Sequence, residues 1–154
     1  MFISFHDTST AANEELQSLR DDVETLQKHH KPKEYKMDGY TYRIYYDKKS
    51  WDHAQEICQH WGGHLAVILD KKMRDYVHSI MPETAWIGLT DRWIEGEWQT
   101  WDRKKVTYWY WREGEPNNGQ KIKRKNEHCA AKVETNEMND EECSKKLGFI
   151  CQSA

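Results

Sequence analysis

Trp86-Ile-Gly-Leu89 has the apolar content of a short buried strand, and the stretch that follows it decides the fold. From residue 91 to about residue 126 nothing is strongly periodic, apart from short aromatic stretches at 98–101 and 108–111. A long irregular stretch inside a compact domain is usually either functional or disordered. We therefore expect functional side chains in this part of the chain.

The segments around this strand are expected to form two helices and three more strands. Ser50 can cap a helix that Gly62-Gly63 ends, and a second helix is expected from Asp70 to just before Pro82. Helices early in the chain, with short strands and loops late, predict an α+β fold. The further strands are expected at residues 40–46, 129–133 and 147–151.

Residues 1–31 have a different pattern, which predicts a coiled-coil stalk ahead of the domain at 35–153. Residues spaced alternately by three and four form a narrow stripe, typical of a coiled-coil seam. The alternative is an amphipathic helix that lies on its own domain. Pro32 ends the helix. Association is expected, but the stripe does not reveal the oligomer number, because some positions are polar. The stripe comprises Phe2, Phe5, Ser9, Ala12, Leu16, Leu19, Val23, Leu26 and His30.

Charge and hydropathy exclude several classes of function. The formal net charge of −3 favours neither nucleic acid nor a membrane surface as a partner, and no nucleic-acid binding is expected. No apolar run approaches the length of a membrane span. The first residues, Met-Phe-Ile-Ser-Phe, are too short and uncharged for a signal peptide, so any signal or anchor is expected outside this chain.

The four cysteines, Cys58, Cys129, Cys143 and Cys151, contain no C-x-x-C pair, so a zinc cluster or redox motif is not expected. An even number scattered along the chain favours two disulfides and an oxidising compartment. Spacing alone leaves three pairings open. The alternative is four buried free thiols in a cytosolic protein.

Hard oxygen donors gather in the later half of the chain. They lie in Gly114-Glu-Pro-Asn-Asn118, at Glu127 and in Asn139-Asp140. Calcium takes about six to eight such oxygens, whereas thiolates and imidazoles suit other metals. The bond before Pro116 is the kind of peptide bond most able to be cis, which would turn both neighbouring side chains to one side. The alternative is an ordinary turn, and the segment Glu115-Pro-Asn117 taken alone favours that alternative.

The order of these features along the chain is more specific than any one of them. In sequence they are Trp86-Ile-Gly-Leu89, Glu115-Pro-Asn117, Glu127 two residues before Cys129, Asn139-Asp140 before Cys143, and Cys151. In this arrangement the chain resembles the C-type lectin-like domain, specifically its mannose-type sugar-binding members. The resemblance covers roughly residues 35–153.

The resemblance implies a fold, two disulfides and a metal site. The fold has two helices, short antiparallel strands and a long calcium-binding loop region. The implied disulfides are Cys58–Cys151 and Cys129–Cys143. A trimer, joined through the coiled coil, is the oligomer that the resemblance favours. The implied ligands of a principal calcium ion are Glu115, Asn117, Glu127, Asn139 and Asp140.

The function implied is calcium-dependent binding of mannose-type glycans, not catalysis. Two vicinal equatorial hydroxyls of mannose, fucose, N-acetylglucosamine or glucose replace water on the ion, and the same side chains hydrogen-bond them. Pathogen or glycan recognition in innate immunity is implied, by a secreted lectin or the ectodomain of a type II membrane receptor. The alternative is the same domain binding a protein or another non-sugar ligand.

Two features depart from the family pattern. An auxiliary calcium in some members would be held here by Asp91, Glu95, Asn118, Glu127 and His128, where many members have Asp at the last position. Imidazole is a poor calcium ligand, so this site is expected to be weak or empty. Met138 stands where the family usually has Trp, and it can fill the same apolar volume less rigidly.

A run of basic residues between Asn118 and Glu127 is the last candidate feature. Lys121, Lys123, Arg124 and Lys125 could form a rim beside the sugar that favours sulfated, phosphorylated or otherwise anionic glycans. The alternative is a solvated loop.

Overall fold

The computed structural model describes residues 5–118 and 126–154, with side chains described from 9 to 26 and from 31 onward within these ranges. The chain divides into two compact units, Met1–Pro32 and Lys33–Ala154. Over the described residues, no helix has both the length and the apolar content needed to cross a membrane.

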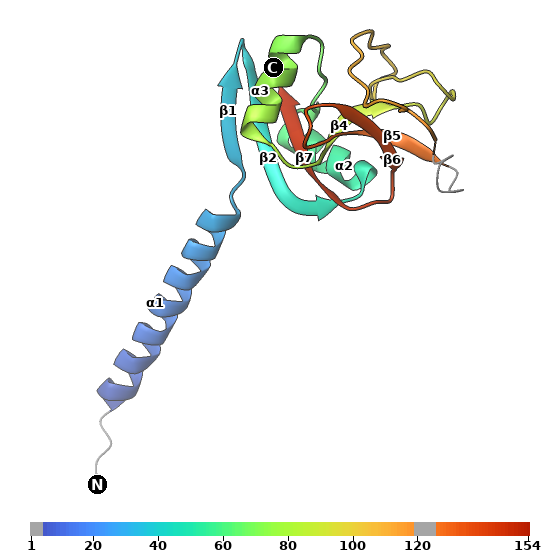
Figure 1. Cartoon of the computed structure of the whole chain (residues 1–154). Coiled ribbons are helices and arrows are strands. Elements are labelled where there is room, and N and C mark those ends of the chain that lie inside the picture. The colour runs from blue at the N-terminus through green and yellow to red at the C-terminus, as the bar shows by residue number, and fades with distance from the viewer. Residues whose placement is uncertain (1–4, 119–125) are drawn as a thin grey trace. The chain divides into compact units, whose positions relative to one another are not determined.

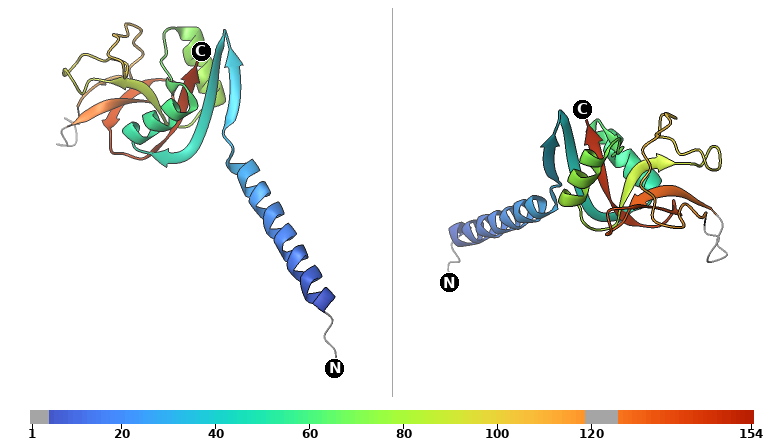
Figure 2. Two further views of the ribbon diagram at one scale, coloured as in Figure 1. Left: turned by 180° about the vertical axis from the view of Figure 1, so that it is seen from behind. Right: turned by 45° about the horizontal axis from the view of Figure 1, so that its top comes forward.

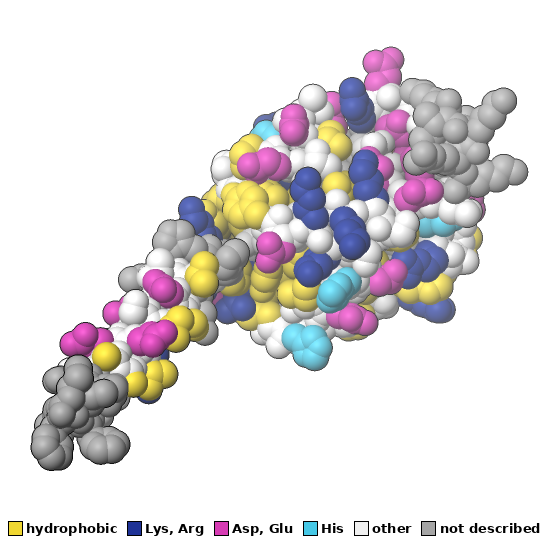
Figure 3. Space-filling view, turned by 90° about the horizontal axis from the view of Figure 1, so that it is seen from below, with side chains coloured by type: hydrophobic (Ala, Val, Ile, Leu, Met, Phe, Trp, Pro, Cys, Tyr) yellow, Lys and Arg dark blue, Asp and Glu magenta, His cyan; other side chains and the backbone are white. Residues whose placement is uncertain are grey.

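The first unit is built on one helix, α1 (Phe5–His30). Leu16, Leu19, Val23 and Leu26 are each at least half exposed along it. Figure 3 shows hydrophobic side chains along the described part of this helix. These four apolar positions of the predicted seam are therefore open to solvent in a single copy of the chain.

The second unit is an α+β domain whose sheet has the strand order β1-β2-β7-β4-β5-β6, with β3 also paired to β7 (Figure 1). Neighbours are antiparallel except β4 and β7, which are parallel, so the sheet is mixed where antiparallel strands were expected. The strands are β1 (Lys33–Met37), β2 (Tyr40–Lys49), β3 (His64–Leu65), β4 (Ala85–Thr90), β5 (Glu127–Lys132), β6 (Met138–Glu142) and β7 (Leu147–Ser153).

The two predicted helices form with the expected ends. In α2 (Trp51–Trp61) the Ser50 hydroxyl accepts from the His53 N–H, and Gly62 closes the helix with a positive φ of 99°. In α3 (Lys71–Ile80) the Asp70 carboxylate accepts from the Met73 N–H. These caps satisfy backbone groups that the ends of a helix leave unpaired, so the local sequence is enough to place them.

Close packing around β4 explains the glycine in Trp86-Ile-Gly-Leu89. All six residues of β4 are buried. A Cβ at Gly88 would lie 2.4 Å from the carbonyl oxygen of Leu65, so a side chain there would push β3 away from β4. The disulfides join Cys58 to Cys151 and Cys129 to Cys143, the pairs that the resemblance implies. They tie α2 to β7, and β5 to the turn after β6.

The described part of the long segment between β4 and β5 lies at the opposite end of the domain from the β1–β2 hairpin. Figures 1 and 2 show this arrangement in all three views. The strands β5 and β6, which pair with each other, extend toward the same end. This end of the domain therefore brings together the loop and strand residues that were expected to bind a metal ion.

Candidate functional site

Three carboxylates from three different parts of the second unit converge. One oxygen each of Glu115, Glu127 and Asp140 lies within 4.8 Å of the other two. Glu115 comes from the long loop, Glu127 begins β5, and Asp140 lies in β6. Asp140 is 1% exposed and Glu127 is 9% exposed, so these negative charges are held close together and largely away from water.

Asp140 also holds the loop to the sheet. The backbone N–H of Asn117 donates to both carboxylate oxygens, at 3.1 and 3.0 Å, and the N–H of Asn118 donates to Oδ2 at 2.6 Å. Hydrogen bonds from backbone N–H groups stabilise an ionised carboxylate. Asp140 is therefore both a candidate ligand and the anchor of the loop that carries the other ligands.

The two asparagines of the predicted ligand set have different surroundings. Asn117 Nδ2 donates to Glu115 Oε1 at 2.8 Å, across the cis Glu115–Pro116 bond, and so orients that carboxylate. Asn139 Nδ2 donates to Glu141 Oε1 at 3.3 Å. Asn139 Oδ1 is buried and accepts no hydrogen bond from the described residues, so an oxygen donor remains available beside Asp140.

Asn118 closes the base of the predicted basic loop. Its Oδ1 accepts from the N–H groups of Asn126, at 3.1 Å, and Glu127, at 3.0 Å. Glu127 is thereby fixed at the start of β5. The predicted rim residues Lys121, Lys123, Arg124 and Lys125 lie outside the described residues.

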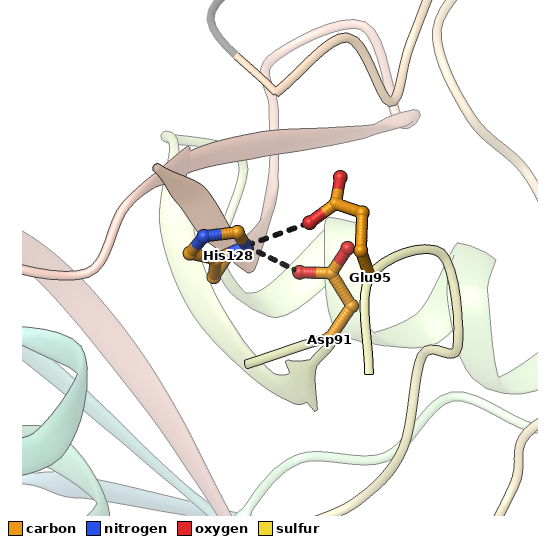
Figure 4. A group of neighbouring side chains, drawn as sticks. All are labelled: Asp91, Glu95 and His128. Atoms are coloured by element: carbon orange, nitrogen blue, oxygen red, sulfur yellow. Dashed lines mark hydrogen bonds and ion pairs between the residues drawn. The ribbon is translucent and has the colours of Figure 1, made fainter. Parts of the chain in front are cut away.

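A second group joins Asp91, Glu95 and His128, as Figure 4 shows. His128 Nδ1 lies 2.9 Å from Asp91 Oδ1 and 3.2 Å from Glu95 Oε2. Partial desolvation, together with the neighbouring Asp91 carboxylate, raises the pKa of Glu95. Three of the residues predicted for the auxiliary site are therefore together, whereas the side-chain oxygen of Asn118 is engaged by the backbone of the loop.

The chemistry of the two groups differs although both are rich in carboxylates. The first offers only oxygen donors, which suit hard ions such as calcium. Glu127 and Asp140 are buried and Glu115 is partly buried, so this cluster of negative charge would be stabilised by a bound cation. The first group therefore fits calcium, and the imidazole in the second group does not.

Arg112 lies beside the site, and sequence patterns did not reveal this position. It lines an open hollow of about 700 Å³ with Glu113, Gly114 and Glu115, and it also lines a second hollow with Asn139. Its backbone N–H donates to the Met138 carbonyl at 2.8 Å, so the loop runs along β6 at this point. One basic residue three positions before Glu115 forms no pattern that could be recognised in the sequence. Arg112 comes close to the site because its backbone pairs with Met138 of β6.

Comparison with known proteins establishes the family. The family model described as the lectin C-type domain matches residues 47–153. The fold and the matched residues together define a C-type lectin domain, and the chain belongs to that family.

The chain is similar to a C-type lectin of the lectoxin type from Thrasops jacksonii, at 30% identity over 127 residues, which cover 74% of this chain and 77% of the relative. It is 32% identical over 118 residues to the hepatic lectin of Gallus gallus, covering 75% of this chain and 55% of that protein, so it spans about half of this longer relative. Among solved structures, the trimeric structure of the Kupffer cell C-type lectin receptor Clec4f superposes with a TM-score of 0.72 at 25% identity. That match covers 94% of this chain and 95% of the other.

Proposed function

We propose that this chain is a calcium-dependent lectin for mannose-type sugars, acting as a binding protein outside the cell. The observation that carries the proposal is the convergence of Glu115, Glu127 and Asp140, with Asn117 oriented against Glu115. Asn117 and Asn139 complete the proposed set of calcium ligands. The names of the relatives support sugar binding as a class.

The proposed ligands act through their fixed donor and acceptor roles. When bound, calcium supplies coordination positions that two neighbouring hydroxyls of a sugar can fill in place of water. Glu115 and Glu127 can only accept hydrogen bonds from those hydroxyls, whereas the amides of Asn117 and Asn139 can donate to them. This fixed pattern selects the geometry of the hydroxyl pair, and in the resembled family the order Glu-Pro-Asn accompanies equatorial 3- and 4-hydroxyls.

Binding to immobilised mannan tests this proposal directly. We expect binding in millimolar calcium, complete loss on adding a calcium chelator, and recovery when calcium is restored. Free mannose, fucose and N-acetylglucosamine should compete, and free galactose should not. Binding that survives the chelator would refute the calcium-dependent mechanism, and equal competition by galactose would refute the mannose-type specificity.

We propose further that α1 assembles the chain into a trimer. The solvent-exposed apolar positions of α1 support association, and the trimeric receptor structure covers the helical segment as well as the domain. A single shallow sugar site binds weakly, and linking several sites raises the avidity for a surface that bears many sugars by up to about 10²–10⁴-fold.

Charged substitutions in the stripe of α1 are expected to separate the copies. In the double variant Leu19→Asp and Val23→Asp, burial of two carboxylates would oppose helix association. Light scattering should then report a monomer, and mannan binding should weaken at least about tenfold while the affinity for free mannose is unchanged. The matched control, Ser18→Asp with Thr25→Asp, places the same charges outside the stripe and should stay oligomeric. A monomeric parent protein would contradict the assembly proposal.

The basic residues at 121–125 lead to a separate expectation about salt. If they form a rim beside the sugar, raising the salt concentration from about 0.05 to 0.5 M should weaken binding of sulfated glycans, because screening shortens the range of charge interactions. Neutral mannose should bind equally at both concentrations. A glycan array read at the two salt concentrations measures this, and equal salt dependence for both ligands would rule out the rim.

A further inference from the structure

We propose that Asp91, Glu95 and His128 form a binding site for a transition-metal ion of the zinc type, in the place where the family resemblance implies an auxiliary calcium. The proposal does not depend on sugar binding. Both carboxylates are turned toward the imidazole, and all three side chains come from adjoining parts of the second unit (Figure 4).

The spacing of the donor atoms suits a small ion. Zinc bonds of about 2.0–2.1 Å in a tetrahedron separate neighbouring ligand atoms by about 3.3 Å. His128 Nδ1 is 2.9 Å from Asp91 Oδ1 and 3.2 Å from Glu95 Oε2, so two edges of such a tetrahedron are already nearly formed. One ligand atom from each of the three residues lies within 4.8 Å of the other two, so the three side chains can reach a common ion.

The donor set distinguishes this site from the first one. Imidazole nitrogen is a common zinc ligand and a poor calcium ligand, and carboxylates complete many zinc sites. Glu115, Glu127 and Asp140 offer oxygen alone, whereas His128 adds nitrogen to two oxygens. Of the two groups of possible metal ligands found among the described residues, the second is the one that includes the nitrogen donor typical of zinc sites.

The backbone holds two of these ligands in place without a metal. Asp91 is 3% exposed, and its Oδ2 accepts from the Gly96 N–H at 3.0 Å, which leaves Oδ1 toward His128. The carbonyl of His128 accepts from the Thr90 hydroxyl at 2.6 Å and from the Asp91 N–H at 3.2 Å. Ligands that are already oriented lose little further freedom when an ion binds.

Charge and access also favour an added cation. The guanidinium of the neighbouring Arg92 is paired with Asp52 instead of with Asp91 or Glu95. It donates two hydrogen bonds to Asp52, at 2.7 and 2.9 Å. The side chain of Glu95 is 58% exposed and that of His128 is 24% exposed, so an ion can enter from solvent. Water can occupy the fourth position, as it does in zinc sites with three protein ligands.

Metal titration of the full chain tests the proposal. Protein stripped of metal is titrated with zinc in competition with a chromophoric chelator, and cobalt(II) is added separately to record the visible absorption of a tetrahedral site. We expect one zinc ion per chain at this site, with affinity reduced at least about tenfold in Glu95→Gln and in His128→Asp. His128→Asp should also bind one more calcium ion than the parent, because an oxygen donor replaces nitrogen.

The matched control is His60→Asp, which removes an exposed histidine from α2 and makes the same change of side chain. It should keep the zinc affinity and the cobalt spectrum of the parent. Unchanged zinc affinity in His128→Asp, or an equal loss in His60→Asp, would place the ion elsewhere and overturn the proposal. Mannan binding is measured separately in calcium, so a failure of sugar binding would count against the proposed lectin function alone.

Discussion

Asp140→Asn is expected to abolish calcium-dependent mannan binding and to lower the calcium affinity by at least about 100-fold. The substitution removes one of three converging charges, and loss of a well-placed charge at a buried site costs several kcal/mol. It also places an amide NH₂ against the backbone donors of Asn117 and Asn118, where the carboxylate accepts three hydrogen bonds. The loop that carries Glu115 would then lose its anchor on β6.

Calcium titration followed by tryptophan fluorescence measures this effect, and near-ultraviolet circular dichroism shows whether the core remains native. The matched control is Asp47→Asn, which removes the same charge from an exposed position on β2. It should bind calcium and mannan as the parent does. Calcium affinity that is preserved in Asp140→Asn would show that the ion, if bound, lies elsewhere.

The double variant Glu115→Gln with Asn117→Asp is expected to reverse the sugar preference from mannose to galactose. Asn117 Nδ2 now donates to Glu115 Oε1, and in the variant the new glutamine amide can donate to the new aspartate. The internal hydrogen bond is kept with its direction reversed, and the charge of the pair is unchanged. In the variant, position 115 offers a hydrogen-bond donor to the sugar hydroxyls in place of an acceptor, and position 117 offers only acceptors. A mispaired hydrogen bond costs about tenfold or more in affinity.

Inhibition of binding to a mannose-bearing and a galactose-bearing neoglycoprotein by free sugars measures the reversal. The single variant Glu115→Gln tests the effect of charge apart from the arrangement of hydrogen-bond donors and acceptors. It removes one carboxylate from the proposed calcium ligands, so it should bind both sugars weakly. Glu113→Gln changes an exposed neighbour on the same loop and should leave the preference as it is. A double variant that still prefers mannose would refute the assigned ligands.

Local signals in the sequence were enough to predict the helices and the buried strands. Ser50, Asp70 and Gly62 act on backbone groups within a few residues, so their effects can be read without the rest of the fold. The apolar run of β4 has the same property. Family resemblance, rather than local pattern, supplied the disulfide pairs and the proposed ligand set.

The strands β1, β3 and β6 were not predicted, and the reason is physical. The sequence of β6, Met-Asn-Asp-Glu-Glu, has poor intrinsic strand preference, because Asn, Asp and Glu are depleted in strands. Pairing with β5 and the disulfide from Cys129 to Cys143 impose the strand. The parallel contact between β4 and β7, and the anchoring of Asn117 by Asp140, likewise depend on segments distant in sequence.

The hydrogen bonds of the Asn118 side chain to Asn126 and Glu127 bring together the two residues that flank positions 119–125. A single amide oxygen accepts from both N–H groups, so the start of β5 is held beside Asn118. Because the ends are already held together, and the entropy of closing a loop grows slowly with its length, a longer or shorter segment at 119–125 should cost little stability. The same join offers protein engineers a point for grafting a foreign peptide beside the site.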